Sequence, residues 1–142
     1  MKRFGWMAAV ALAALGFGMF AGPGATTLAA KKEDKMLLHN VFFTLKDSTD
    51  ANRAKLIEAC KKYLVKHEGV VYFAAGARGT EFAREVNDKD FDVGLHIVFK
   101  DKASHDKYAD APDHLKFIEE EKATWKTVKV FDDYIETVDP KG

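Results

Sequence analysis

Residues 36–45, MLLHNVFFTL, constrain the fold more than any other part of the chain. Successive side chains of a strand point to opposite faces, and here both faces are largely apolar. One face carries Leu37, His39, Val41, Phe43 and Leu45, and the other carries Leu38, Asn40 and Phe42. This pattern predicts a strand that is covered on both sides. A layer of helices covers only one face of a sheet, so the other face needs a second partner.

The sequence beyond residue 45 predicts three more strands and two helical regions, the second of which consists of two helices. A helix begins at Ser48, Thr49 or Asp50, has His67 in its last turn and stops at Gly69. Strands are expected over 70–77 and 91–99, with a polar connection at 84–90. A short helix over about 102–110 ends before Pro112, because the residue before a proline is disfavoured in helical geometry. A further helix runs to about residue 125, and 126–136 form the last strand.

Four strands and two helical crossings predict an α+β fold of the ferredoxin-like (split βαβ) type. The four-stranded sheet is expected to be antiparallel, with its helices on one face. The other face then needs the partner that the strand at 36–45 requires. A second copy of the chain is the simplest partner, since two-fold pairing is the commonest oligomeric arrangement. We therefore expect a homodimer.

The first thirty residues have the layout of a secretory signal peptide. Lys2 and Arg3 precede an apolar run over about 4–20, and the small residues of ATTLAA follow a Gly-Pro-Gly break. Cleavage is expected after Ala29 or Ala30, giving an exported (periplasmic or secreted) protein with no stable membrane association. An uncleaved membrane anchor is the alternative, but the run is short and contains glycines. The expected organisation is a signal peptide at 1–30, a charged lead-in at 31–35, a domain at 36–136 and a tail at 137–142.

Charge and composition exclude several classes of function. The chain has 22 basic and 22 acidic residues, and removal of residues 1–30 leaves 20 basic and 22 acidic, a formal charge of −2. A near-neutral chain without a basic stripe is not expected to bind nucleic acid. No serine lies in a nucleophile-elbow pattern. Cys60, the only cysteine, lies on an apolar helix stripe, where a buried thiol that acts as a small hydrophobe is expected.

The five histidines do not follow a recognisable metal-ligand spacing, so no metal site is predicted. A convergent site formed by His39, His96 and His114 stays open as an alternative. His105 is expected on a solvated helix face.

Tyr108 and His114 flank the proline break in YADAPDH and are the candidate catalytic residues, together with His39. In the first turn of a helix, His114 faces the positive end of the helix dipole, which favours a neutral imidazole. Such an imidazole accepts a proton, and a tyrosine hydroxyl stabilises a developing oxyanion. The alternative is purely structural: Tyr108 packs at a helix corner, His114 caps it, and His39 is a core histidine with satisfied hydrogen bonds.

Several tracts resemble the stress-responsive dimeric α/β-barrel (Dabb) family. They are LLHNVFFTLKD at 37–47, DFDVGLHIVFKD at 90–101, YADAPDHLKF at 108–117 and the ending W…VFDDY. The resemblance spans about residues 36–136 and is most specific in Tyr108 and Pro112-x-His114. It implies a ferredoxin-like protomer whose sheet closes with that of a second copy into a barrel.

The resemblance also implies site residues. Polyketide-cyclising members of this family use a histidine at the position of His114 as a base, with a tyrosine matching Tyr108 and a histidine matching His39. This chain departs from them at Val93, where the cyclases have a histidine on the third strand. It also has Asp113 in place of a frequent alanine.

Two hypotheses follow, and neither uses a cofactor. In the first, an exported stress-response-type homodimer of unassigned activity binds a small apolar or aromatic ligand between sheet and helices, in contact with Val41, Phe43, Leu95 and Trp125. In the second, a cyclase or lyase uses His114 as general base while Tyr108 and His39 stabilise an enolate; a cofactor-free monooxygenase is a related option. Convergence of Tyr108, His114 and His39 on one cavity favours an enzyme, whereas a solvent-facing His114 excludes one.

Overall fold

A computed structural model describes residues 35–137 of the chain. The expected signal peptide and nearly all of the lead-in and tail lie outside the described residues. The elements are β1 (Leu37–Leu45), α1 (Asp50–Leu64), β2 (Val70–Ala77), β3 (Val93–Phe99), α2 (Lys102–Ala109), α3 (Pro112–Glu121), the 3-10 helix η2 (Lys122–Thr124) and β4 (Trp125–Tyr134). None of the helices in this part of the chain is long and apolar enough to span a bilayer.

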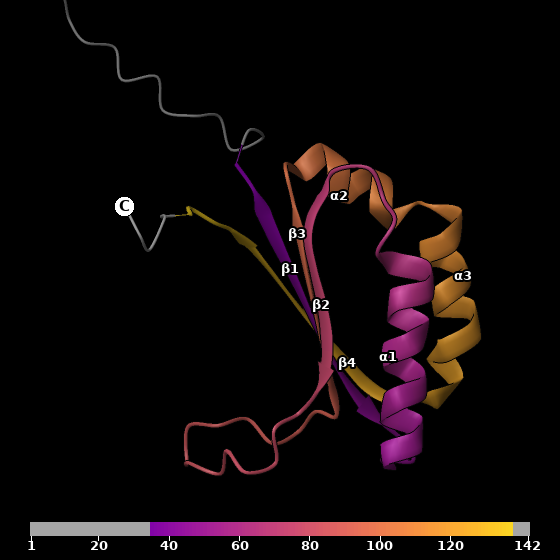
Figure 1. The fold of residues 1–142 in the computed structure, drawn as a ribbon, viewed down its shortest axis with the longest axis vertical. Helices are drawn as coiled ribbons and strands as arrows, with labels where there is room; N and C mark the ends of the chain where they lie inside the picture. Colours follow the sequence, from indigo (N-terminus) through magenta and orange to yellow (C-terminus); the bar gives the residue numbers. More distant parts are fainter. Residues whose placement is uncertain (1–34, 138–142) are drawn as a thin grey trace, which may run out of the picture.

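The four strands form one antiparallel sheet in the order β2-β3-β1-β4. Figure 1 shows the three α-helices together on one side of this sheet, which confirms the predicted ferredoxin-like arrangement. The first and last strands are neighbours, so the two ends of the domain lie side by side. There, the Lys35 ammonium lies 2.7 Å from the Glu136 carboxylate.

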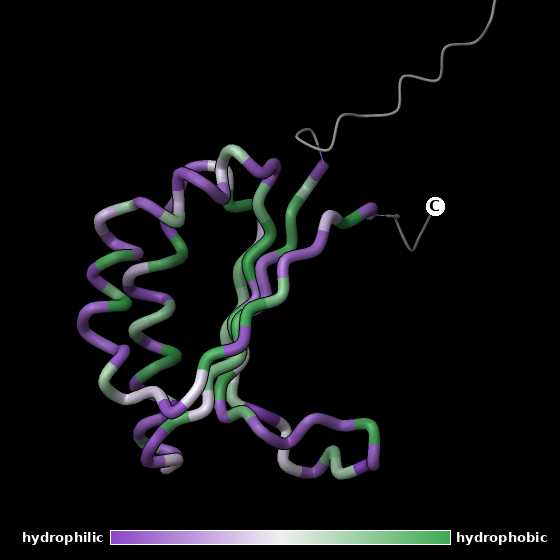
Figure 2. Tube along the Cα trace, turned by 180° about the vertical axis from the view of Figure 1, so that it is seen from behind, coloured by the Kyte–Doolittle hydropathy of each residue, from purple (hydrophilic) through white to green (hydrophobic). Residues whose placement is uncertain are grey.

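The core lies between the helices and the sheet, and β1 runs through its centre. All five of the predicted inward residues of β1 are buried, as are Val93, Leu95, Ile97 and Phe99 of β3. From α1, the core receives Leu56, Ala59, Cys60, Tyr63 and Leu64. Burial raises the pKa of the Cys60 thiol to about 12, so this residue is the inert hydrophobe that the sequence indicates. Figure 2 shows the apolar stretches of the helices turned toward the sheet.

α1 begins as predicted but ends earlier than predicted. The Thr49 hydroxyl caps it by accepting a hydrogen bond from the Asn52 amide. The helix stops at Leu64, so His67 lies beyond its last turn. His67 instead forms a 2.9 Å hydrogen bond from Nε2 to the Tyr63 carbonyl, which has no partner within the helix. Gly69, at φ 86°, makes the turn into β2, where a Cβ atom would collide with Ser104.

The face of the sheet away from the helices carries aromatic side chains. Phe42 packs edge-on against Phe91 and Phe131, with ring centroids 5.0 and 5.9 Å apart. Phe131 is 53% exposed and Tyr72, on β2, is 58% exposed. Residues 78–92, which join β2 to β3, project on this same side (Figure 1). This is the second apolar face that the sequence of β1 predicts.

Replacement of Ile97 by alanine tests the position of the core. Ile97 has no exposed surface, and the cavity left by Ile97→Ala is expected to lower the free energy of unfolding by about 2–5 kcal/mol. Leu115→Ala is the control, because Leu115 is 54% exposed on α3 and its loss is expected to change stability by less than about 0.5 kcal/mol. Urea unfolding at fixed protein concentration measures both; equal losses would contradict this assignment of the core.

Candidate active site between α3 and the sheet

The corner between α2 and α3 places Tyr108 beside His114. Ala111 is extended, with φ −67° and ψ 140°, and Pro112 begins α3. This is the predicted bend, because the proline ring excludes the preceding residue from helical geometry. Across the bend, the ring centroids of Tyr108 and His114 lie 4.4 Å apart.

His114 is held as a neutral imidazole with one free nitrogen. Its Nδ1 lies 2.8 Å from the Ala109 carbonyl oxygen. A carbonyl only accepts, so Nδ1 carries the proton and the lone pair of Nε2 is left to act as a base. Burial lowers the pKa of His114. The Ala109 hydrogen bond opposes this effect, and the neighbouring histidines reinforce it.

Tyr108 supplies a hydroxyl that is not engaged within residues 35–137. Its ring packs against His67 and Phe99, with centroids 4.9 and 5.0 Å away, and the side chain is almost fully buried. Burial raises the pKa of Tyr108 well above its usual value. The hydroxyl therefore stays protonated and is a hydrogen-bond donor.

His39 reaches the same region from β1. It stands directly across from Asp132 of β4, and its Nδ1 lies 2.6 Å from the Asp132 carboxylate. Burial lowers the pKa of His39, while the hydrogen bond to Asp132 partly offsets the effect. Asp132 thus orients the ring, with Nδ1 donating and Nε2 directed elsewhere.

These three side chains line a single cavity of about 230 Å³. It forms because α3 packs mainly against α1 and not on the edge strand β4. The rest of its wall is apolar and contains all four predicted ligand-contacting residues, Val41, Phe43, Leu95 and Trp125, together with Leu64, Phe117, Ile118, Val128 and Val130. The last two are partly exposed and lie at the mouth. The structure therefore brings all seven predicted site residues together.

Trp125 adds a polar feature that its sequence context does not reveal. Its indole Nε1 is buried and has no hydrogen-bond partner among the described residues. An unpaired buried donor costs about 1–3 kcal/mol. Trp125 lines the cavity, and its Nε1 lies behind the cavity surface, covered by other protein atoms.

Two residues near the site were not assigned to it from the sequence. His105 was expected on a solvated face, and this is wrong: its ring packs 5.2 Å from that of His39 and 5.5 Å from that of Phe99. The i, i+3 spacing of His105 and Tyr108 is the signal that relates them, since such residues share a helix face. Asp132 is the second residue. Its role depends on strand register, which the pair Asp132-Asp133 does not reveal by itself.

The alternative histidine trio does not assemble. His96 is opposite Asn40 in the β1–β3 register, on the face of the sheet away from the helices. Its Nδ1 lies 2.7 Å from the Asn40 side-chain oxygen. Strand alternation puts His39 on the other face, so His96 cannot join His39 and His114 at one ion.

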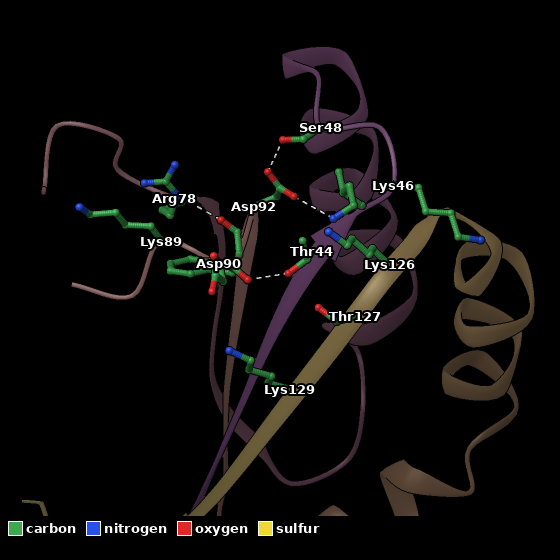
Figure 3. Close-up of a pocket in the computed structure, with 12 residues that line it drawn as sticks. Thr44, Lys46, Ser48, Arg78, Lys89, Asp90, Asp92, Lys126, Thr127 and Lys129 are labelled. Atoms are coloured by element: carbon green, nitrogen blue, oxygen red, sulfur yellow. Dashed lines mark hydrogen bonds between the residues drawn. The ribbon is translucent and has the colours of Figure 1, made fainter. Parts of the chain in front are cut away.

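A larger cavity of about 590 Å³ lies at the opposite end of β1. Figure 3 shows its charged lining, with Asp92 held by Ser48 and by the Leu45 backbone amide. Lys46 is turned away and donates to the Ala123 carbonyl. In the same cleft, Thr44 donates to the Asp90 carbonyl and Arg78 to the Phe91 carbonyl, and none of the predicted site residues lines it. We therefore place the candidate site in the smaller, apolar cavity.

Comparisons with known proteins agree with the fold. The family model described as Stress Responsive A/B Barrel Domain (Dabb) matches residues 37–135. A Dabb protein of known structure from Mesorhizobium loti, with a ferredoxin-like fold, is 26% identical with a TM-score of 0.58; the match covers 73% of this chain and 99% of that one. A comparison with curated protein sequences finds no match.

More distant structures share the architecture. A dimeric ferredoxin-like protein of unknown function from Thermobifida fusca is 15% identical with a TM-score of 0.59, over 72% of this chain and 93% of that one. A hydroxynitrile lyase from Passiflora edulis is 16% identical with a TM-score of 0.60, over 75% and 99%. At these identities the likeness establishes the fold.

The lowered pKa of His114 predicts a pH dependence of stability. In the unfolded chain this histidine titrates near its ordinary value of about 6.5. As the pH falls through that value, the unfolded state takes up the proton first, so the free energy of unfolding decreases; above it, the stability is fully present. NMR titration of the His114 ring is expected to give a midpoint below 6.5. Urea unfolding of His114→Asn should show a smaller loss of stability between pH 7 and 5. A midpoint above 6.5 would contradict the neutral imidazole.

Proposed function

The chain belongs to the stress-responsive A/B barrel (Dabb) family, and we propose that it is an exported homodimer that binds a small apolar or aromatic molecule. The ligand occupies the cavity between α3 and the sheet. Its body contacts the apolar wall, and one carbonyl or carboxylate group accepts hydrogen bonds from the wall.

One observation carries this proposal: an apolar cavity is lined by two residues whose side-chain donors have no hydrogen-bond partner among residues 35–137. The Tyr108 hydroxyl and the Trp125 indole Nε1 both belong to residues that line it. Small-molecule sites combine such apolar walls with a few polar groups that orient the ligand. A cavity of about 230 Å³ is below the usual range for drug-sized ligands, which indicates a small one.

The dimer and the export rest on separate observations. Dimeric assembly is supported by the aromatic face of the sheet and by relatives of the same fold that are dimeric. Export is supported by the signal-peptide pattern of residues 1–30, which is a feature of the sequence.

A second candidate function, proton abstraction next to a carbonyl, is favoured by the tautomer of His114. With Nδ1 bonded to Ala109, Nε2 is the basic atom, and His114 lines the cavity. Nε2 would take a proton from the carbon beside the ligand carbonyl, and Tyr108 would donate to the enolate oxygen. His39, whose Nδ1 donates to Asp132, presents only a lone pair at Nε2 when it is neutral, so the enolate charge would be stabilised by Tyr108 and not by His39. The reaction would be of the lyase or cyclase type and would use only the groups of the protein.

The cavity is tested with 3-benzoylpropionate, an aryl ketone with a carboxylate. Calorimetry is expected to show saturable binding to the wild type. Val130→Phe should weaken binding by about tenfold or more, since the larger ring enters the mouth of the cavity. Leu115→Phe is the matched control because Leu115 is exposed on α3 and does not line the cavity. Equal binding by both variants would place the ligand elsewhere.

The same ligand separates binding from catalysis. Exchange of its ketone α-protons with D2O, followed by NMR, is expected to be faster with wild-type protein than without it. His114→Ala should lower the exchange rate about 10²–10⁴-fold, the usual contribution of a general base, while binding stays within a few-fold. If the wild type binds but does not accelerate exchange, the ligand-binding proposal stands and the catalytic one does not.

The proposed dimer is tested by charging its contact face. Phe131→Asp puts a carboxylate among the aromatic rings around Phe42, where burial by a partner would be costly. Analytical ultracentrifugation is expected to find the wild type dimeric and this variant largely monomeric. Leu115→Asp, on the helical side, should stay dimeric. A monomeric wild type, or equal effects of the two variants, would contradict pairing through this face.

A further inference from the structure

We propose that His39, His105 and Asp132 form a binding site for a first-row divalent cation of the Zn²⁺ type. One ligand atom from each residue lies within 4.8 Å of the others. At tetrahedral angles, bonds of roughly 2.0–2.2 Å place two ligand atoms about 3.3–3.6 Å apart. The most separated ligand atoms of the cluster would therefore have to approach one another by about 1.2–1.5 Å to bind one ion.

The three ligands come from three elements that the fold fixes relative to one another. His39 and Asp132 are direct partners in the register of β1 and β4. His105 projects from α2 and packs against His39, with ring centroids 5.2 Å apart. Side chains on helices and strands hold a metal geometry more accurately than side chains on loops.

The cluster is reachable from solvent on one side. The side chain of His39 is 10% exposed, whereas those of His105 and Asp132 are 20% and 44% exposed. A cation can enter between the last two and keep water in its remaining coordination positions. This open arrangement resembles that of metal sites with three protein ligands more than that of closed structural zinc sites.

The chemistry of the donors selects the kind of ion. Two imidazoles and one carboxylate suit Zn²⁺, Co²⁺, Ni²⁺ and related ions, while Mg²⁺ and Ca²⁺ prefer sets of oxygen ligands. Outside the three ligands, Asp106 lies 3.4 Å from His105 Nδ1. An imidazole whose Nδ1 donates to a carboxylate presents Nε2 to a metal, so Asp106 is placed to orient His105.

The proposed ion would lie beside the ligand cavity, because His39 belongs to both. Where Asp132 and His39 Nδ1 both bind the ion, it takes the place of the proton that now joins them, and that proton leaves to Nε2 or to solvent. The metal site does not depend on the proposed ligand: it is defined by His105 and Asp132, neither of which lines the cavity.

Calorimetric titration of tag-free protein with ZnCl₂ tests the site, because a polyhistidine tag would itself bind the ion. Wild type is expected to bind one Zn²⁺ per chain. His105→Asn and Asp132→Asn should each weaken binding by about tenfold or more. His96→Asn is the matched control, since it removes a histidine from the opposite face of the sheet and should bind as the wild type does. Circular dichroism confirms that each variant is folded.

Absence of saturable Zn²⁺ binding by the wild type would overturn the proposal. Binding that His105→Asn retains in full, or that His96→Asn loses equally, would also overturn it. Titration of His105→Asn with 3-benzoylpropionate separates the two proposals. Loss of Zn²⁺ binding with retained binding of the organic acid supports two distinct sites, and failure of either ligand to bind the wild type counts against that site alone.

Discussion

The two-sided apolar pattern of β1 determines the layout of the whole domain: its inward residues are buried and its outward residues are half-buried. The strand lies between β3 and β4 and is the only one that pairs with both. Its inward residues meet the helices and form the centre of the core. Its outward residues, with Phe42 among them, leave an aromatic face that a helical layer cannot cover. The same alternation places His39 on the face of the sheet that meets the helices. Burial of a polar ring there costs free energy unless the ring is hydrogen-bonded. Asp132, directly across on β4, accepts that hydrogen bond.

The proline corner gives the second half of the site. The extended Ala111 and Pro112 form a bend between α2 and α3, and across it the ring centroids of Tyr108 and His114 lie 4.4 Å apart. The short α2 keeps this corner over β3, while α3 leans on α1 and leaves space above β4. The cavity is thus a product of packing: a helix that reached β4 would fill it. The Tyr108 hydroxyl and the neutral imidazoles are the few polar groups on an otherwise apolar wall, an arrangement that is typical of small-molecule sites.

Strong periodicity made most of the fold predictable from the sequence. The strict alternation of β3 and the two-sided apolar pattern of β1 correctly indicated both strands and the single helical layer. The predicted end of α1 was wrong: the helical spacing of the sequence continues to His67, whereas the helix ends at Leu64 with Val65 as its C-cap, and the chain turns into β2 at Gly69.

Those residues of the candidate site that belong to a local sequence motif could be predicted. Residues whose roles depend on contacts between distant parts of the chain could not. Tyr108 and His114 stand out through the proline between them. His105 does not, because α2 buries only Ser104 and Tyr108 and its pattern hardly defines an inward face. The role of Asp132 depends on its register with His39, and the unpaired Trp125 Nε1 on what surrounds it in three dimensions. Neither is encoded in local spacing.

A crystal structure of the protein with bound 3-benzoylpropionate would show where the ligand lies. The phenyl ring is expected between Phe117 and the β4 valines, with a ligand oxygen about 2.7–3.2 Å from the Tyr108 hydroxyl or the Trp125 indole nitrogen. A ligand found instead in the charged cleft around Asp92, or one whose oxygens avoid both donors, would contradict this placement of the site.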